Sequence, residues 1–255
     1  MEEIMVYFVG AGSGAADLIT VRGAKLLREA DAIIYAGSLV SEELLRERKE
    51  SCKIFNSAYM TLDEVIETIE EMQKEGKMTV RLHTGDPSLY GAIREQMDRL
   101  DTLEIEYEIC PGVSSFSAAA AALKSEYTLP GISQSVIITR MEGKTPVPPK
   151  ESIRSFAAHR CTMVIFLSAS LTEALQEELI QGGYDPSTPA AIVYKASWKD
   201  EKIIRCRVGT LHESAVNNHI TRHALITVGD FLGDEYETSL LYDPAFATGY
   251  REASK

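Results

Sequence analysis

The turn at Thr84–Pro87 is the first stretch whose residue types and order suggest a chemical site. Residues 78–82 alternate apolar and polar side chains, which is the two-residue period of a β-strand. The strand must end at the turn, because Gly85 adopts backbone angles that other residues avoid, Asp86 favours a side-chain turn and Pro87 has no N–H to donate. Open α/β sheets bind small molecules at such turns. We expect a binding turn; a solvated connection is the alternative.

A glycine-rich turn, Gly10–Gly14, follows an apolar strand at residues 4–9. Three alternate glycines allow backbone N–H groups to come close to a ligand. The spacing is not the G-x-G-x-x-G of dinucleotide sites, and Asp31 begins the next strand instead of ending it, which counts against a Rossmann site. An ordinary tight turn remains the alternative.

The elements that carry these turns alternate regularly through the first half of the chain. Apolar patterns predict strands at residues 4–9, 32–35, 53–55, 78–82 and 105–109, and helices at residues 20–30, 61–76 and 90–100. Thr61–Glu64 has the pattern of a capping box, and Ser41 can cap a further short helix. This rhythm predicts a doubly wound, mainly parallel sheet in a first α/β domain, residues 1–112.

A second set of elements follows in residues 113–255. A helix of small apolar residues is expected at 113–123, and a second capping box at Ser170–Glu173 is expected to open another helix. Strands are expected at residues 135–139, 162–167, 190–194, 202–208 and 224–228. The last two strands follow each other at short spacing, as in an antiparallel or mixed sheet. The fold class is therefore α/β, with a second α/β domain built on a mixed sheet.

Composition excludes several classes of function. The 255 residues are 45% hydrophobic and 25% charged, as in ordinary globular proteins. A net charge of −12 argues against general binding to nucleic acid or to anionic membranes. We expect no membrane span, and the acidic amino terminus gives no secretion signal, so a cytoplasmic location is expected. The four cysteines form no C-x-x-C pair, so neither a bound metal nor a disulfide frame is expected.

Three sequence blocks together resemble one family. Residues 10–20, Gly85–Pro87 and Pro111–Ser115 are similar in order and spacing to the main motifs of the tetrapyrrole (corrin and porphyrin) methyltransferases, and Tyr194–Trp198 resembles a fourth block. Finer matches, which point to a corrin-ring (precorrin) methyltransferase within the family, lie at residues 35–40, 129–140, 143–146 and 196–201. The resemblance covers nearly the whole chain up to about Gly233.

The resemblance implies two α/β domains, S-adenosylmethionine (SAM) bound as co-substrate in a cleft between them, and a homodimer. The residues it implies as SAM contacts are Thr84, Gly85, Asp86, Leu89, Ser114, Ser115, Leu167 and Ala196. Two departures matter: Ser13 stands where the family often has proline, and no acid lies near Ala36 or Gly37, where some members have a proposed base. The catalytic base is therefore unknown.

This chemistry requires few side chains. SAM already carries an activated methyl group, which an electron-rich carbon of the macrocycle can attack directly, so the enzyme supplies orientation and excludes water. Asp86 is the best candidate to hold a polar part of SAM, with a turn-capping role as the alternative. His83 could face the macrocycle, but a histidine at a strand end is more often structural.

The implied tetrapyrrole (precorrin) substrate carries many carboxylates and needs cations. The candidates near polar turns are Arg140, Lys144 and Lys195, with Arg22 and Arg81 as further ones. For each of them a solvated surface charge is the alternative. The proline-rich loop at residues 140–149 is expected to form one wall of the macrocycle site.

Three other functions remain open. The chain could methylate another ring position, because the SAM blocks do not determine regiospecificity. It could be a nucleotide-binding oxidoreductase, which would retain NAD instead of SAM. It could also be a tetrapyrrole carrier, which would bind the pigment without consuming SAM.

Overall fold

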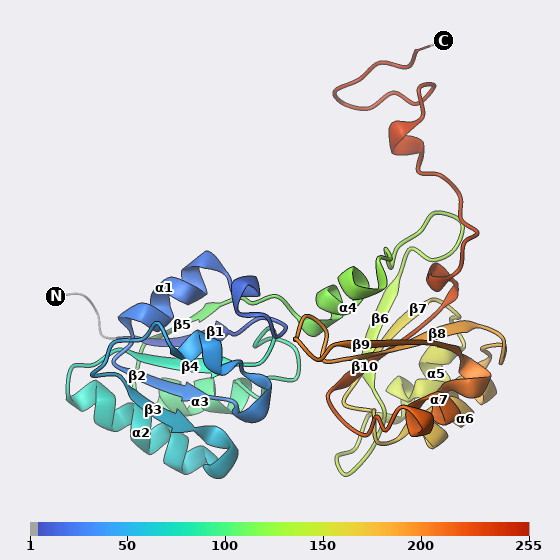
Figure 1. The fold of residues 1–255 in the computed structure, drawn as a ribbon. Coiled ribbons are helices and arrows are strands. Elements are labelled where there is room, and N and C mark those ends of the chain that lie inside the picture. The colour runs from blue at the N-terminus through green and yellow to red at the C-terminus, as the bar shows by residue number, and fades with distance from the viewer. Residues whose placement is uncertain (1–4, 255) are drawn as a thin grey trace. The chain divides into compact units, whose positions relative to one another are not determined.

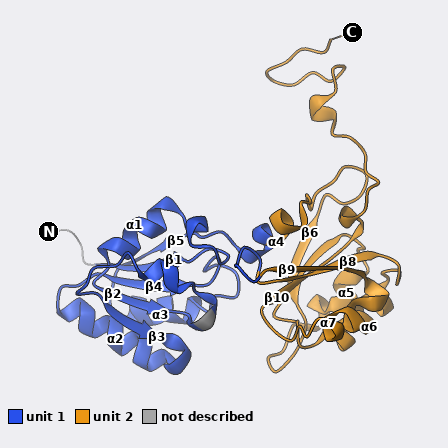
Figure 2. Cartoon of the chain, in the orientation of Figure 1, with its two compact units in different colours: residues 1–118, 196–200 blue, residues 119–195, 201–255 orange. Residues whose placement is uncertain are grey.

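The computed structural model describes residues 5–254, which form two compact units. The first unit comprises Met1–Ala118 and Ala196–Asp200, and the second comprises Ala119–Lys195 and Glu201–Lys255 (Figure 2). The short segment Ala196–Asp200 therefore belongs to the first unit although it is flanked on both sides by chain of the second. The described part of the chain contains no helix that is both long and apolar enough to cross a membrane.

The first unit is built on a five-stranded sheet in the order β3-β2-β4-β1-β5, with every neighbouring pair parallel (Figure 1). The strands are β1 (Val6–Gly10), β2 (Ala32–Tyr35), β3 (Lys53–Asn56), β4 (Thr79–His83) and β5 (Tyr107–Cys110). The helices are α1 (Val21–Glu29), α2 (Leu62–Lys74) and α3 (Arg94–Thr102), and α4 (Ser115–Leu123) begins in this unit and ends in the second. The expected doubly wound parallel sheet is confirmed.

Both faces of this sheet are buried. On one face Val9, Ile33 and Leu82 pack with Leu27 of α1, and on the other Phe8, Ile34, Val65 and Leu100 pack together beneath α2 and α3. All five residues of β4 are buried because it lies at the centre of the sheet. The carboxyl ends of the strands, with their turns, therefore lie at a single edge of a rigid platform.

Most of the helix caps and helix starts predicted for the first unit are found in the structure. Thr61 and Glu64 form the expected capping box at the start of α2, and Ser41 caps a short 3-10 helix. The helix expected from Tyr90 onward begins only at Arg94, so that part of the prediction is wrong. Tyr90 and Ala92 have φ values of +56° and +49°, and a Cβ on Gly91 would lie 2.2 Å from Pro87 O, so a tightly wound loop takes the place of the first helical turn.

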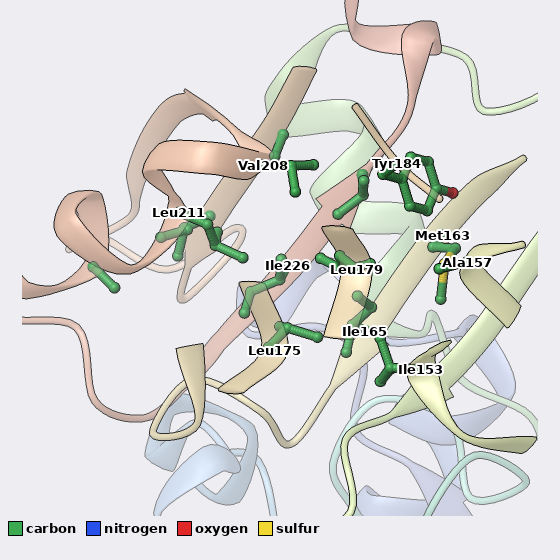
Figure 3. Close-up of a cluster of buried hydrophobic side chains, with 14 of the residues drawn as sticks. Ile153, Ala157, Met163, Ile165, Leu175, Leu179, Tyr184, Val208, Leu211 and Ile226 are labelled. Atoms are coloured by element: carbon green, nitrogen blue, oxygen red, sulfur yellow. The ribbon is translucent and has the colours of Figure 1, made fainter. Parts of the chain in front are cut away.

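The second unit has a mixed sheet in the order β6-β7-β10-β8-β9. Its strands are β6 (Val136–Arg140), β7 (Thr162–Phe166), β8 (Pro189–Tyr194), β9 (Lys202–Arg207) and β10 (Ala224–Val228), and its helices are α5 (Ile153–Ala157), α6 (Thr172–Gly182) and α7 (Leu211–Asn217). Only the pair β6–β7 is parallel, which confirms the mixed sheet. Figure 3 shows its core, where Met163, Ile165 and Ile226 meet Leu175 and Leu179.

The second capping box is wrong. Helix α6 has Leu171 at its N-cap, with no side-chain cap, so Ser170 lies one residue too early to cap it. The Thr172 hydroxyl is instead within hydrogen-bond distance of His212 Nδ1, at 3.0 Å. Short 3-10 helices connect the main elements at Ala16–Leu18, Gly37–Leu39, Glu42–Leu45, Ser57–Tyr59, Pro149–Glu151, Val208–Thr210, Asp230–Leu232 and Leu240–Tyr242.

Candidate binding and methyl-transfer site

The glycine turn after β1 and the turn after β4 are joined backbone to backbone. Gly85 N donates to Gly12 O at 2.9 Å, and Gly12 N donates to Gly85 O at 3.2 Å. Both glycines have positive φ, +81° for Gly12 and +64° for Gly85, which other residues adopt only with strain. Two of the sequence blocks singled out above therefore form one structural feature.

The third block packs against the same feature. A Cβ on Gly112 would lie 2.2 Å from Gly85 O and 2.7 Å from Gly10 Cα, so the three turns touch through their backbones. A Cβ on Gly85 would lie 3.7 Å from Ser114 Cα and from Ser115 N. Ser115 is the first residue of α4, and the N–H groups of Ser117 and Ala118 donate to Ser114 O at 3.1 and 3.4 Å.

Asp86 links the second block to the third. Its Oδ1 accepts hydrogen bonds from Ser88 N at 2.9 Å and from the Ser88 hydroxyl, while its Oδ2 accepts from Gly112 N at 2.8 Å. Burial alone would raise the pKa of Asp86, but the hydrogen bonds from Ser88 and Gly112 outweigh it and lower the pKa below its usual value. Asp86 is thus an ionised, turn-capping residue. Its Oδ1 already accepts two hydrogen bonds, whereas Oδ2 accepts only one and keeps a further lone pair for a ligand.

The segment Ala196–Asp200 closes the glycine turn from the other side. Ala15 N donates to Ser197 Oγ at 3.1 Å, and the Ser13 and Ser197 hydroxyls lie 3.1 Å apart. A Cβ on Gly14 would lie 2.1 Å from Trp198 Nε1, so the indole occupies the space that any other residue at position 14 would need. Ala196 is buried in this arrangement.

Comparison with a protein-family model shows to which family the chain belongs. The model of the tetrapyrrole (corrin/porphyrin) methylases matches residues 5–212. The chain is a tetrapyrrole methylase. The resemblance expected from the glycine turn and the blocks at Gly85–Pro87 and Pro111–Ser115 is confirmed.

Individual relatives show which members of the family this chain resembles. The methylase is 51% identical over 251 residues to a cobalt-precorrin-4 C(11)-methyltransferase of Methanocaldococcus jannaschii, covering 98% of this chain and 97% of the relative. A solved cobalt precorrin-4 methyltransferase matches with a TM-score of 0.89 and 46% identity, over 91% of this chain and 97% of that one. Uroporphyrin-III C-methyltransferase of Thermus thermophilus, solved with S-adenosyl homocysteine, matches with a TM-score of 0.75 and 26% identity, over 90% and 93%.

Most of the residues expected to contact SAM lie in the first unit of the methylase. Thr84, Gly85, Asp86, Leu89, Ser114, Ser115 and Ala196 are all there. Leu167 belongs to the second unit, directly after β7, where it is 68% exposed with a φ of +52°. These assignments to SAM remain predictions.

The cationic candidates Arg140, Lys144 and Lys195 all belong to the second unit. Arg140 ends β6, and its guanidinium donates to the carbonyls of its own loop, at 3.2 Å to Thr145 O and 2.7 Å to Pro146 O. Lys144 is exposed on the same loop. Lys195 Nζ lies 5.5 Å from the centre of the Tyr194 ring. Arg140 thus organises the loop, and Lys144 is the residue of the pair that points to solvent.

Sequence reasoning missed a cavity in the first unit. It has a volume of about 670 Å³ and is walled by Tyr35, Tyr59 and Trp198, with Asn56 and Arg46 among its other lining residues. The sequence signal was present only in part: Tyr35 and Trp198 lie in the finer resemblance blocks, but nothing near Arg46 or Tyr59 marks them as site residues.

His83, at the end of β4, is buried and neutral. Burial first, and then the positive charge of Arg81, lower its pKa from 6.5 to about 3. Its Nε2 has no hydrogen-bond partner within residues 5–254, and its ring lies 5.9 Å from that of Phe8. A neutral imidazole cannot form an ion pair with a substrate carboxylate.

We expect this burial to appear in the pH dependence of stability. The unfolded chain protonates His83 near pH 6.5, whereas the folded chain does so only near pH 3, so stability is lost as the pH falls through that window, by at most about 1.4 kcal/mol per pH unit. Urea unfolding of a His83→Gln variant at pH 7, 6 and 5 should show a shallower loss than the wild type. The same substitution at the exposed His159 is the control, and equal slopes in all three proteins would contradict the expectation.

Proposed function

We propose that this methylase transfers the methyl group of SAM to C11 of precorrin-4 or cobalt-precorrin-4 during corrin-ring synthesis. The observation that carries the proposal is the 51% identity to a relative named cobalt-precorrin-4 C(11)-methyltransferase, over 98% of this chain and 97% of that relative. The finer resemblance to precorrin-4 C11-methyltransferase, on residues 35–40, 129–140, 143–146 and 196–201, agrees with it.

The chemistry of the turns suits SAM. Bound SAM supplies a methyl group on a positively charged sulfur. The first N–H groups of the nine-residue helix α4, beginning at Ser115, suit a carboxylate, and the ionised Asp86 suits an ammonium group or a ribose hydroxyl. The protein's contribution is then to orient the two reactants and to exclude water, with no nucleophile of its own.

The aromatic cavity of the first unit is our candidate for part of the macrocycle. Three ring-bearing side chains, Tyr35, Tyr59 and Trp198, offer flat surfaces to a flat ligand. The guanidinium of Arg46 forms no hydrogen bond or ion pair within the described chain and can pair with a carboxylate of the ligand. Glu43 is already paired with Lys199 at 2.8 Å, so its charge opposes such a ligand less than its position suggests.

The direct test is a product assay. Purified protein is incubated with SAM and precorrin-4, and separately with its cobalt form, and the new methyl group is located by NMR. A methyl at C11 supports the proposal, and the more rapidly methylated form identifies the branch. A methyl at another ring carbon would place the chain elsewhere in the family, and binding of the pigment without consumption of SAM would make it a carrier.

The proline-rich loop supplies a prediction for substrate binding. Lys144→Ala should weaken binding of the carboxylate-rich macrocycle by about ten- to a hundredfold, because one charge-assisted contact of roughly 1.5–3 kcal/mol is lost. Arg140→Ala should weaken it as well, since the loop loses the guanidinium that holds the Thr145 and Pro146 carbonyls. Fluorescence titration with uroporphyrin, at low salt, measures both.

Lys150→Ala is the matched control for the loop, because Lys150 is an exposed lysine just beyond it. SAM affinity should be unchanged in all three variants. Unaltered uroporphyrin affinity in both Lys144→Ala and Arg140→Ala would exclude this loop from the macrocycle site, and Arg22 and Lys195 would be tested next.

The proposal includes a homodimer and a cytoplasmic location, both on the ground of the family resemblance. Sedimentation gives the test of the first: a 28.1 kDa species at micromolar concentration would contradict a dimer.

A further inference from the structure

Arg81, on the central strand β4, is a buried cation with only neutral partners. It is 6% exposed, and its guanidinium donates to Gln96 Oε1 at 3.0 Å, to Ile34 O at 2.9 Å and to Ser57 Oγ at 3.0 Å. Within residues 5–254 no carboxylate accepts a hydrogen bond from it, and burial lowers its pKa to about 10. The solvated surface charge considered as an alternative for this residue is therefore wrong.

One branch of this network leads to the aromatic cavity. Ser57, which accepts from Arg81, donates its own hydroxyl hydrogen to Tyr35 O at 3.1 Å. Tyr35 lines the cavity, and so do Asn56 and Tyr59 on either side of Ser57. Arg81 therefore holds the ends of β2 and β3 together directly behind the cavity wall.

The other branch leads to the loop that follows the binding turn. Gln96, which accepts from Arg81 Nε, donates through Nε2 to Ala92 O at 2.9 Å. Ala92 and Tyr90 both have positive φ without being glycine, so this loop is strained and depends on its surroundings to keep its shape. The loop also contains Leu89, one of the residues expected to contact SAM.

A buried arginine of this kind lowers the folding stability, which is unfavourable for a residue with a purely structural role. A buried charge without a counter-charge costs stability, and an apolar residue of similar shape commonly serves a core at least as well. The planar guanidinium, however, can reach three acceptors in fixed directions, which the single ammonium of lysine cannot do. The geometry therefore indicates that the guanidinium serves to hold three segments, at Ile34, Ser57 and Gln96, in a fixed mutual arrangement.

We propose that Arg81 is a positioning residue for methyl transfer, which orders the cavity wall at Ser57–Tyr59 through one branch and the loop Pro87–Ile93 through the other. The inference rests on the proposed function for the identity of the reaction. It adds that the macrocycle and SAM are positioned by separate branches from one buried guanidinium.

Two substitutions cut the branches one at a time. Ser57→Ala removes the cavity branch, and we expect it to weaken uroporphyrin binding five- to tenfold while SAM affinity stays within twofold. Gln96→Met removes the loop branch, and we expect the reverse pattern. Arg81→Lys keeps the charge but loses the fork, so both affinities should fall, together with the turnover rate in the product assay. Fluorescence titration and calorimetry measure the two affinities.

If Arg81 had a purely structural role, the variants would have lower melting temperatures, but the affinities for uroporphyrin and for SAM would not change in opposite ways. Equal changes in both affinities for Ser57→Ala and for Gln96→Met, or no change in either, would overturn the inference. Should Arg81→Lys fail to fold, the two branch variants still decide the matter. The binding measurements need no turnover. If the two branch variants show opposite changes in the two affinities while the wild type does not methylate precorrin-4, the proposed function is refuted and this inference stands.

Discussion

Replacing Asp86 by alanine should abolish tight SAM binding and leave the secondary structure intact. Both carboxylate oxygens accept from backbone N–H groups, of Ser88 and of Gly112, so the variant loses the link between two of the three turns. It also loses the carboxylate that we propose as the anionic partner of SAM. The unsatisfied amides should lower the free energy of unfolding by roughly 1–3 kcal/mol. Calorimetry with SAM and circular dichroism measure the two effects.

The second unit offers a matched control for Asp86. Asp185 makes the same kind of turn, accepting from Ser187 N at 2.7 Å and from its hydroxyl at 2.6 Å. Asp185→Ala should therefore lose comparable turn hydrogen bonds without changing SAM affinity. Unchanged affinity in Asp86→Ala would remove Asp86 from the site and leave it a turn cap alone.

Adding one methyl group at Gly112 should have the second large effect. The Cβ of Gly112→Ala would lie 2.2 Å from Gly85 O, a backbone atom that cannot rotate away, so one turn must move from the other. We expect SAM affinity to fall at least tenfold, and overpacking of this kind costs about 1–3 kcal/mol of stability.

Gly249→Ala is the control, because a Cβ there would meet no atom within 4 Å. Isothermal calorimetry and urea unfolding on both variants separate loss of the site from loss of the fold. A Gly112→Ala protein with wild-type SAM affinity would show that the contact between the turns is dispensable for binding.

Local patterns predicted the elements well where the cause is local. The alternation at residues 78–82 and the hydroxyl of Thr61 act within a few residues, and both β4 and the cap of α2 appear as expected. Ser170 fails as a cap because α6 starts one residue later, where Thr172 meets His212 from a distant helix. Tyr90 has helical spacing, but the tight turn over Pro87 prevents a helix there.

The candidate site was predictable only in its turns. Blocks at Gly10–Gly14, Gly85–Pro87 and Pro111–Ser115 carry glycine and proline signals that can be read from the sequence, and the structure brings them together. Arg81 could not be read in this way, because alternation alone puts it on a polar face. Only the position of β4 at the centre of a sheet covered on both faces shows that the guanidinium is buried.

The segment Ala196–Asp200 has a consequence for how the gene can be divided. Because Ser197 and Trp198 complete the glycine turn of the first unit from between β8 and β9, neither unit corresponds to one uninterrupted stretch of codons. A fragment ending at residue 118 would leave Gly14 facing an empty space where the indole belongs. An exchange of the first unit for that of a relative would therefore have to move two separate stretches of sequence, the first 118 residues and these five.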